Sequence, residues 1–325
     1  MARPLRIDYP GAIYHITCRG NERRAIVADD ADRIAFQQRL ARCVETYQLR
    51  LHGYVLMDNH FHLMVESPLG NVSPAMRQFN VAYTGYYNRR HQRSGHLYQG
   101  RFKAIVVEAD AYLLELSRYI HLNPIRVGRA RSMTTEEQVR NLRDYGWSSL
   151  RGYLRTRDRE KWITYDRVLA YTGGDTSGGR AAYARYVEEG MTKGVPRPWD
   201  KVVGGVLLGG ETFVASMQRR FRMIRDRERP AVRAVAQVVL PEVISKRIEA
   251  LLRGEGLRDT TIGRGLLTEC LYRYGQMTQS DIGRHVGGIG YSRVSQLRRA
   301  FREAAEADRH VRELFVRAQQ VIAKD

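Results

Sequence analysis

The sequence is poor in several features that define whole classes of protein. Its three cysteines, Cys18, Cys43 and Cys270, are scattered along 325 residues, which argues against a disulfide framework or a cysteine-rich metal motif. No segment approaches the roughly 18 consecutive apolar residues that span a bilayer. The first twenty or so residues also lack an apolar signal core. We therefore expect a cytoplasmic protein that has no membrane partner.

Lysine is scarce too, although the chain is strongly basic. It has 54 basic residues against 35 acidic ones, a net charge of +19, and all but six of the basic residues are arginine. A GC-rich genome would explain arginine in place of lysine but not the excess over acidic residues. A basic membrane-surface protein is the weaker alternative, because no long basic amphipathic segment has an aromatic face. Arginine grips phosphate and stacks on bases, so the charge favours a nucleic acid partner.

The hydrophobic pattern predicts alternating strands and helices in the first part of the chain. A tight turn at Asp58-Asn59 joins two of the strands, and the order β-α-β-β-α-β-α predicts an α+β fold with an antiparallel sheet. Glycines between residues 173 and 179 mark a linker, after which the chain is mostly helical. The expected strands are Ala12–Arg19, Leu51–Met57, His60–Glu66 and His96–Ala109, and the expected helices follow Asp29-Asp30, Pro74 and Asp110.

The stretch MDNHFHLMVE places two histidines at the start of a predicted strand. Successive strand side chains point to opposite faces, so His60 and His62 share one face and Phe61 takes the other. Two imidazoles side by side suit a metal ion if a third ligand lies elsewhere. In the later segment RYIHLNP, Tyr119 and Asn123 are four residues apart and lie on one face of a helix. An amide oxygen at that helix end can complete such a metal site, with the tyrosine close to it.

Each of these residues also has a structural interpretation when it is taken alone. A strand histidine is usually a half-buried polar group, Tyr119 alone is a core aromatic, and Asn123 before a proline is a helix-end cap. Only their combination predicts chemistry. His15 and His121 could approach the site, and we interpret both as structural. The tyrosines of the second predicted helix are interpreted as packing residues; they are Tyr83, Tyr86 and Tyr87.

Five segments in this order resemble the REP-associated tyrosine transposases, a branch of the HUH superfamily of single-strand DNA nucleases. The resemblance covers about the first 155 residues, and Tyr98 departs from it where the family often has tryptophan. The segments are PGAIYHITCRGNERR (Pro10 to Arg24), MDNHFHLMVE (Met57 to Glu66), GHLYQGRFK (Gly95 to Lys103), RYIHLNPIRVG (Arg118 to Gly128) and WSSLRGY (Trp147 to Tyr153).

The resemblance implies a ferredoxin-like antiparallel sheet with helices, the HUH nuclease fold. It also implies that Tyr119 is the nucleophile, that His60, His62 and Asn123 hold the metal, and that a 5′-phosphotyrosine and a free 3′-OH are formed. Mixed imidazole and oxygen ligands permit Mn²⁺, and cellular supply favours Mg²⁺. The family's substrate is a short palindromic repeat folded as an imperfect DNA hairpin.

Two groups of residues in this part are candidates for holding DNA. The segment GHLYQGRFK interleaves aromatic and basic residues, as in proteins that grip single strands, and its alternative is a solvated strand whose aromatics pack below. A second basic group surrounds the end of the first strand. The predicted DNA-binding residues here are Arg19, Arg23, Arg24, Tyr98, Arg101, Phe102 and Lys103.

Met277 to Glu303 reads as a helix-turn-helix and resembles the DNA-binding domain of the bacterial replication initiator. Gly287 to Gly290 form the turn, and Ser292 is the expected cap of the second helix. The loop GGIGYS differs from the initiator's charged turn, and an ordinary helical hairpin is the alternative. The arginine-rich segment from Glu211 to Arg229 either follows phosphates or is solvated. The expected base or phosphate contacts of the second helix are Arg293, Gln296 and Arg298.

These observations predict three parts: a catalytic domain at 1–155, a linker and helical extension at 156–260, and a helix-turn-helix domain at 261–325. The predicted function is a metal-dependent single-strand DNA endonuclease and strand transferase, a transposase, that acts on hairpin repeats and contacts duplex DNA through its C-terminal domain. The alternatives are a regulator that binds repeat hairpins without turnover and a metal-dependent RNA nuclease. The repeat-associated branch leans towards monomers, and the sequence leaves the oligomeric state and the recognised DNA sequence open.

Overall fold

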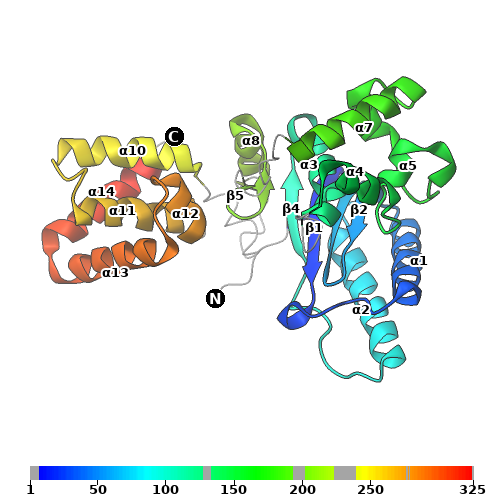
Figure 1. Cartoon of the computed structure of the whole chain (residues 1–325). Coiled ribbons are helices and arrows are strands. Elements are labelled where there is room, and N and C mark those ends of the chain that lie inside the picture. The colour runs from blue at the N-terminus through cyan, green and yellow to red at the C-terminus, as the bar shows by residue number, and fades with distance from the viewer. Residues whose placement is uncertain are drawn as a thin grey trace. The chain divides into compact units, whose positions relative to one another are not determined.

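The computed structural model describes residues 7–126, 133–192, 202–222, 239–275, 277 and 279–323. The chain divides into two compact units, one within residues 6–199 and the other containing residues 200–325, and both are drawn in Figure 1. The non-helical joint predicted at 195–200 lies outside the described residues. The same holds for the last arginines of the predicted arginine-rich helix, which are Arg225, Arg227 and Arg229.

The first unit has the predicted order of strands and helices. The strands are β1 (Ala12–Arg19), β2 (Arg50–Leu56), β3 (His60–Ser67) and β4 (Lys103–Val107). The longer helices are α1 (Asp30–Thr46), α2 (Val72–Arg90), α3 (Ala109–His121), α4 (Thr135–Asp144) and α7 (Ser177–Thr192). Shorter elements are the 3₁₀ turns η1 (Asn21–Arg23) and η2 (Asn123–Ile125) and the helices α5 (Leu150–Leu154) and α6 (Asp166–Leu169).

The strands of this unit lie in the order β2-β3-β1-β4, and all of these neighbours are antiparallel. This arrangement confirms the α+β class and the antiparallel sheet. Helices α1 and α2 cover the face of Phe61, whose ring lies 5.2 Å from that of Phe36 and 5.8 Å from that of Phe79. Helix α3 packs against β2 and β3. The opposite face of β3, with His60 and His62, is therefore the face available to α3.

Several element boundaries differ from those expected; helix α2, for example, begins at Val72, two residues before Pro74. Strand β4 begins at Lys103 rather than at His96, because Gly100 takes a φ of 119° and the preceding residues form bends instead of a ladder. Helix α3 begins at Ala109 with Glu108 as its N-cap, so Asp110 lies in the first turn. The acidic side chain there still favours the helix, because the N-terminal end of the helix dipole is positive.

The glycine-rich stretch at 173–179 is a tight turn within the first unit. Gly173 and Gly174 have positive φ angles of 101° and 79°, and a Cβ on Gly179 would lie 2.0 Å from the carbonyl oxygen of Gly174. Helix α7 starts inside this stretch, buries Tyr183 and packs on α3 and α5. The unit that holds the sheet thus continues well past residue 155, where we expect the catalytic domain to end.

The second unit is largely helical, as expected. A core of buried aliphatic and aromatic side chains, among them Ile244, Leu266 and Phe301, holds its last five helices together. Among the described residues, no helix is both long enough and apolar enough to cross a membrane. The elements are a hairpin of β5 (Val202–Val203) and β6 (Leu207–Leu208), then α8 (Glu211–Arg222), α10 (Pro241–Gly254), α11 (Thr261–Arg273), α12 (Gln279–His285), α13 (Tyr291–Ala307) and α14 (Arg309–Ala323).

Candidate active site

The start of strand β3 places the two predicted metal ligands side by side. His60 and His62 have only 8% and 6% of their surface exposed, and their ring centroids lie 5.1 Å apart at an angle of 82°. In the antiparallel register they face Arg19 and Thr17 of β1, respectively. The alternation of strand side chains therefore places both imidazoles on one face, as the sequence predicts.

Helix α3 and the turn after it supply the other two predicted residues. The ring of Tyr119, which is half-buried, lies 5.7 Å from that of His62 in an edge-on arrangement, and Asn123 is close enough to His60 to raise its pKa. The Nδ2 of Asn123 donates to the backbone oxygens of Tyr119, at 2.9 Å, and Ile120, at 3.4 Å. These bonds use the amide nitrogen, so Oδ1 is the atom with lone pairs for other partners. The structure thus brings all four predicted residues together.

A neighbouring asparagine fixes the protonated nitrogen of His60. The Nδ2 of Asn59 donates to the backbone oxygen of Arg23 at 2.9 Å, and its Oδ1 lies 2.7 Å from Nδ1 of His60. Because that oxygen can only accept, Nδ1 of His60 carries the hydrogen and donates it. In the neutral ring the lone pair is then on Nε2, which is the form that a metal ligand needs.

His15 is part of this cluster, although its sequence context predicts a structural role. Its Nε2 lies 2.9 Å from Nδ1 of His62, the two rings stack at 5.0 Å, and its ring centroid is 6.4 Å from that of Tyr119. The two-residue period of β1 puts His15 on the same face as Thr17, and this much can be read from the sequence. Only the register of β1 against β3, which pairs Thr17 with His62, brings that face to the histidine cluster. His121 has the structural surroundings expected of it: its ring nitrogens hydrogen-bond with Tyr183 and Ser149.

Burial keeps the three imidazoles of the cluster neutral. It lowers the pKa of His60 to about 4, with a further contribution from the nearby Arg19 guanidinium. Burial also lowers the pKa of His62 well below its usual value, reinforced by His15 and His60, and burial alone lowers the pKa of His15. At neutral pH these rings therefore bear no charge, and an uncharged imidazole is required for metal coordination.

The donor set fits a divalent cation with open coordination positions. Histidine, cysteine, aspartate and glutamate do not gather in groups of three at metal-binding distances anywhere in the described part of the chain, so a metal would depend on a mixed set. Here that set is two neutral imidazoles and one amide oxygen. Such ligands suit Mn²⁺, and Mg²⁺ is compatible through its preference for oxygen and retained water. His60, His62 and Asn123 are the residues that would hold it.

Comparison with known proteins finds a family match within this part of the chain. The family model described as "Transposase IS200 like" matches residues 9–123, a segment that contains all four predicted residues. Residues 9–123 match the IS200-like transposase family. A solved structure described as "Structure of the REP associates tyrosine transposase bound to a REP hairpin" aligns with 54% of this chain and 98% of its own, at 14% identity and a TM-score of 0.39. A comparison with curated proteins gives no match.

Exposed arginines lie at and just after the end of β1, the strand that pairs with the start of β3, in this IS200-like segment. Arg19, Arg23 and Arg24 are all exposed, and Arg24 forms a surface ion pair with Glu22. Backbone hydrogen bonds from Asn21 to Leu97 and from Gln99 to Arg19 tie the segment before β4 to the end of β1. Arg101 and Lys103, both exposed, belong to or follow that segment. The five predicted basic residues of the IS200-like segment are thus on the surface.

The two aromatic residues predicted to stack on DNA lie in the interior instead. Tyr98 and Phe102 are only 7% and 5% exposed, and the ring of Tyr98 packs edge-on against Phe61 at 6.0 Å. A base cannot reach a ring that is covered by the core. The expectation of stacking on these two residues therefore gives way to its alternative, in which the aromatics pack below the basic side chains.

The residues predicted to contact DNA from the helix-turn-helix also divide into exposed and buried ones. Arg293 and Gln296 are exposed on α13, whereas Arg298 is 4% exposed and pairs with the buried Glu269 at 2.8 Å. Arg298 is thus a core ion pair and offers no charge to DNA. The N-cap of α13 is Gly290, so Ser292 lies inside the first turn and is not the cap.

Proposed function

We propose that the protein is a metal-dependent single-strand DNA endonuclease and strand transferase that works through a tyrosine–DNA bond. The observation that carries the proposal is the position of Tyr119, whose ring lies 5.7 Å from that of His62 and one helical turn before Asn123. A candidate nucleophile and the proposed metal ligands thus lie in one cluster. The match of residues 9–123 to IS200-like transposases supports the same reading.

The proposed reaction exchanges one phosphodiester for another. When bound, the cation supplies a positive charge for a non-bridging oxygen of the scissile phosphate. The Tyr119 hydroxyl loses its proton to solvent and attacks phosphorus; the bond to the 3′ oxygen breaks, and that oxygen takes a proton. The products are a 5′-phosphotyrosine and a free 3′-OH. Because one ester replaces another, attack by a 3′-OH on the phosphotyrosine reverses the step and joins strands without ATP.

The surrounding residues have separate parts in this reaction. His60 and His62 remain neutral through burial and keep their orientation through hydrogen bonds to Asn59 and His15. Arg19 is exposed and lies opposite His60 in the β1–β3 ladder, where it can hold the phosphate next to the scissile one. In this proposal Arg19 is the exposed cationic contact, and His60 and His62 are the buried metal ligands.

We extend the proposal to the substrate and to the second unit. The substrate class to test first is a DNA hairpin with a single-stranded foot, which the resemblance to REP-associated transposases implies. In the second unit, Tyr291, Arg293 and Gln296 are exposed around the first turns of α13 and form the proposed duplex contact. The N-terminal catalytic domain would then cut one strand while the C-terminal helices add affinity for duplex DNA.

A labelled hairpin with a single-stranded foot tests the proposal directly. Wild type with Mg²⁺ or Mn²⁺ is expected to form a denaturation-resistant protein–DNA adduct, and Tyr119→Phe is expected to bind the hairpin but form none. Tyr86→Phe is the matched control, because Tyr86 is a half-buried tyrosine of α2 that lies on the other side of the sheet.

The same assay separates the alternatives. Equal cutting by wild type and Tyr119→Phe would contradict the covalent mechanism. Cutting that needs a 2′-hydroxyl and survives Tyr119→Phe would indicate an RNA nuclease. Stable hairpin binding without metal-dependent cutting by any form would indicate a regulator without turnover.

A further inference from the structure

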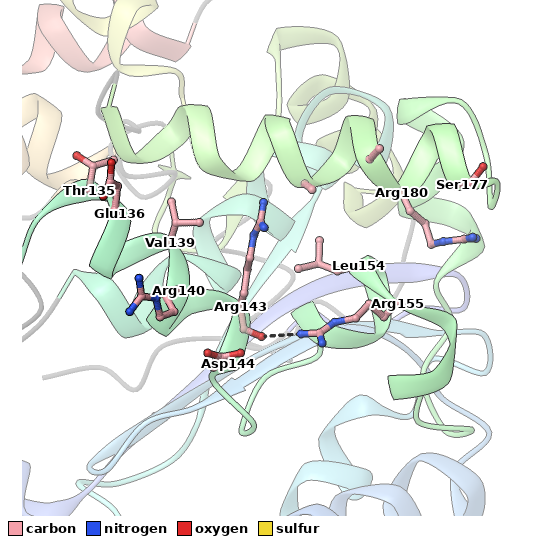
Figure 2. Close-up of a pocket in the computed structure, with 12 residues that line it drawn as sticks. Thr135, Glu136, Val139, Arg140, Arg143, Asp144, Leu154, Arg155, Ser177 and Arg180 are labelled. Carbon is pink, nitrogen blue, oxygen red and sulfur yellow. Dashed lines mark hydrogen bonds between the residues drawn. The ribbon is translucent and has the colours of Figure 1, made fainter.

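A groove of about 870 Å³ lies between α4, α7 and the end of α5. Its walls carry four arginines that Figure 2 labels: Arg140 and Arg143 from α4, Arg155 after α5, and Arg180 from α7. Its volume falls within the range of ligand clefts, roughly 300–1,000 Å³. None of its lining residues belongs to the candidate active site, and no motif of the sequence singles it out.

The lining combines an apolar floor with cationic walls. Val139, Leu154 and Ala184 are half-buried small or aliphatic side chains in the groove. The charged lining residues are the four arginines against two carboxylates, those of Glu136 and Asp144. A ligand that matches both features has a flat, weakly polar part and an anionic part. A nucleotide unit of a single strand has this composition, since every base has an apolar face and every linkage has a phosphate.

Arg143, Arg155 and Arg180 each have a carboxylate partner near the surface, which for Arg155 is Asp158. Arg143 pairs with Glu188, Arg180 pairs with Asp175, and the Nη2 of Arg155 donates to the backbone oxygen of Arg143 at 3.5 Å, the dashed line in Figure 2. The side chain of Arg143 remains 50% exposed in its pair. Surface ion pairs contribute little stability, so a phosphate can share or replace these partners at small cost.

The groove belongs to the same unit as the proposed nucleophile. Helix α4 contacts η2, which begins with Asn123, and α7 packs against α3, which carries Tyr119. A strand held between α4 and α7 would therefore be fixed relative to the elements that build the active site. Binding at this distance from the chemistry would add affinity and orientation without adding a reacting group.

We propose that the α4–α7 groove is a second nucleic acid site, which binds a single-stranded segment of the substrate through phosphate contacts to Arg140, Arg143, Arg155 and Arg180. The inference rests on the proposed function for the identity of the substrate. It goes beyond that function in assigning a separate binding site, formed by residues after the IS200-like segment. An acidic peptide is the competing occupant, and the experiment below distinguishes the two.

The test compares the affinity of the full chain for a labelled DNA hairpin with and without a single-stranded tail of about ten nucleotides. Arg140 is exposed on α4 and Ala181 is exposed in the groove lining, so Arg140→Glu and Ala181→Glu place a negative charge there without disturbing the core. Both variants are expected to weaken binding of the tailed hairpin about tenfold, the effect of losing one charge-assisted phosphate contact. The tail-free hairpin is expected to change by less than about twofold.

Two controls separate charge in the groove from charge in general. Ala181→Gln has nearly the size of Ala181→Glu without its charge, and Arg42→Glu makes the same charge change as Arg140→Glu at an exposed position of α1. Both are expected to bind like wild type. The salt dependence of binding should also become shallower in Arg140→Glu, by a slope of about 0.7 for each lost single-strand phosphate contact.

Several outcomes would overturn the inference. Equal affinity of wild type, Arg140→Glu and Ala181→Glu for the tailed hairpin would do so, as would equal losses with and without the tail. Loss of binding to a labelled polyglutamate peptide, with DNA binding intact, would assign the groove to a protein partner. Affinity is measured here without cleavage. If the wild type forms no Tyr119 adduct, the proposed chemistry is wrong, but this comparison still decides whether the groove binds the single-stranded tail.

Discussion

Nε2 of His15 and Nδ1 of His62 lie 2.9 Å apart in the interior of the sheet, with their rings stacked at an interplanar angle of 14°. His15 is completely buried, so water cannot replace it as the partner of His62. A hydrogen bond to the far nitrogen of a metal-binding histidine fixes its tautomer and its ring orientation. His15 thus orients the proposed ligand His62 through its Nδ1, as Asn59 orients His60 through its Nδ1.

This relationship predicts that His15 positions His62 without touching the substrate. His15→Phe keeps a planar ring but removes the hydrogen bond, and we expect the metal concentration for half-maximal adduct formation to rise about 10- to 100-fold. Saturating metal should restore most of the rate. His15→Gln, which can still hydrogen-bond, is expected to show a smaller shift. A metal titration of adduct formation that gives one curve for all three proteins would contradict the positioning role.

Asn123 is expected to act through its amide oxygen. Asn123→Ala removes that oxygen, and we expect adduct formation to fall by about 10- to 100-fold at fixed Mn²⁺. Asn123→Asp keeps an oxygen ligand and adds a negative charge, so it should retain clearly more activity than the alanine variant despite losing the bonds from Nδ2 to the backbone of α3. Calorimetric titration with Mn²⁺ alone gives an independent reading. Equal metal affinity in the two variants would rule out Asn123 as a ligand.

The sequence predicts this site well where one element carries the information. Strand β1 has the bounds expected of it, and Asp29 caps α1 by accepting a hydrogen bond from the backbone of Asp32. The spacing of His60 and His62 follows from the period of a strand, and that of Tyr119 and Asn123 follows from the period of a helix. Such local periodicities can be read from the sequence without knowing how distant segments pack.

The sequence fails where two distant segments decide the outcome. The contact of His15 with His62 depends on the β1–β3 register, and the burial of Tyr98 depends on Phe61 from another strand. Arg298 looks like an exposed helix residue until Glu269, 29 positions earlier, is placed beside it in the core. The α4–α7 groove likewise arises from the packing of two helices, because no sequence pattern within either helix predicts it.

The buried histidines predict a loss of stability in mild acid. Burial lowers the pKa of His121 to about 3 from an ordinary value of 6.5, so between these values the unfolded chain binds a proton that the folded chain refuses. The free energy of unfolding should therefore fall as the pH drops below about 6.5, by about 1.4 kcal/mol per pH unit for this group, and show no contribution from it above that pH.

Urea unfolding at pH 7.5 and pH 5 measures this effect. Wild type is expected to lose about 2 kcal/mol more between the two conditions than His121→Gln, which has no titratable ring at that position. The variant will be less stable overall, because Tyr183 and Ser149 lose their partner, but the comparison uses only the difference between the two pH values. An identical loss in both proteins would mean that His121 takes up its proton while folded.

Two arginines of α13 are predicted to behave in opposite ways. Arg298→Ala leaves the carboxylate of Glu269, which is 1% exposed, with Arg273 as its remaining ion-pair partner, and we expect a loss of about 3 kcal/mol in the free energy of unfolding. Arg293→Ala removes an exposed side chain and should change stability by less than about 0.5 kcal/mol. It should instead weaken duplex DNA binding about tenfold. If Arg293→Ala binds duplex DNA as tightly as wild type does, the proposed duplex contact of α13 is wrong, whatever the stability measurements give.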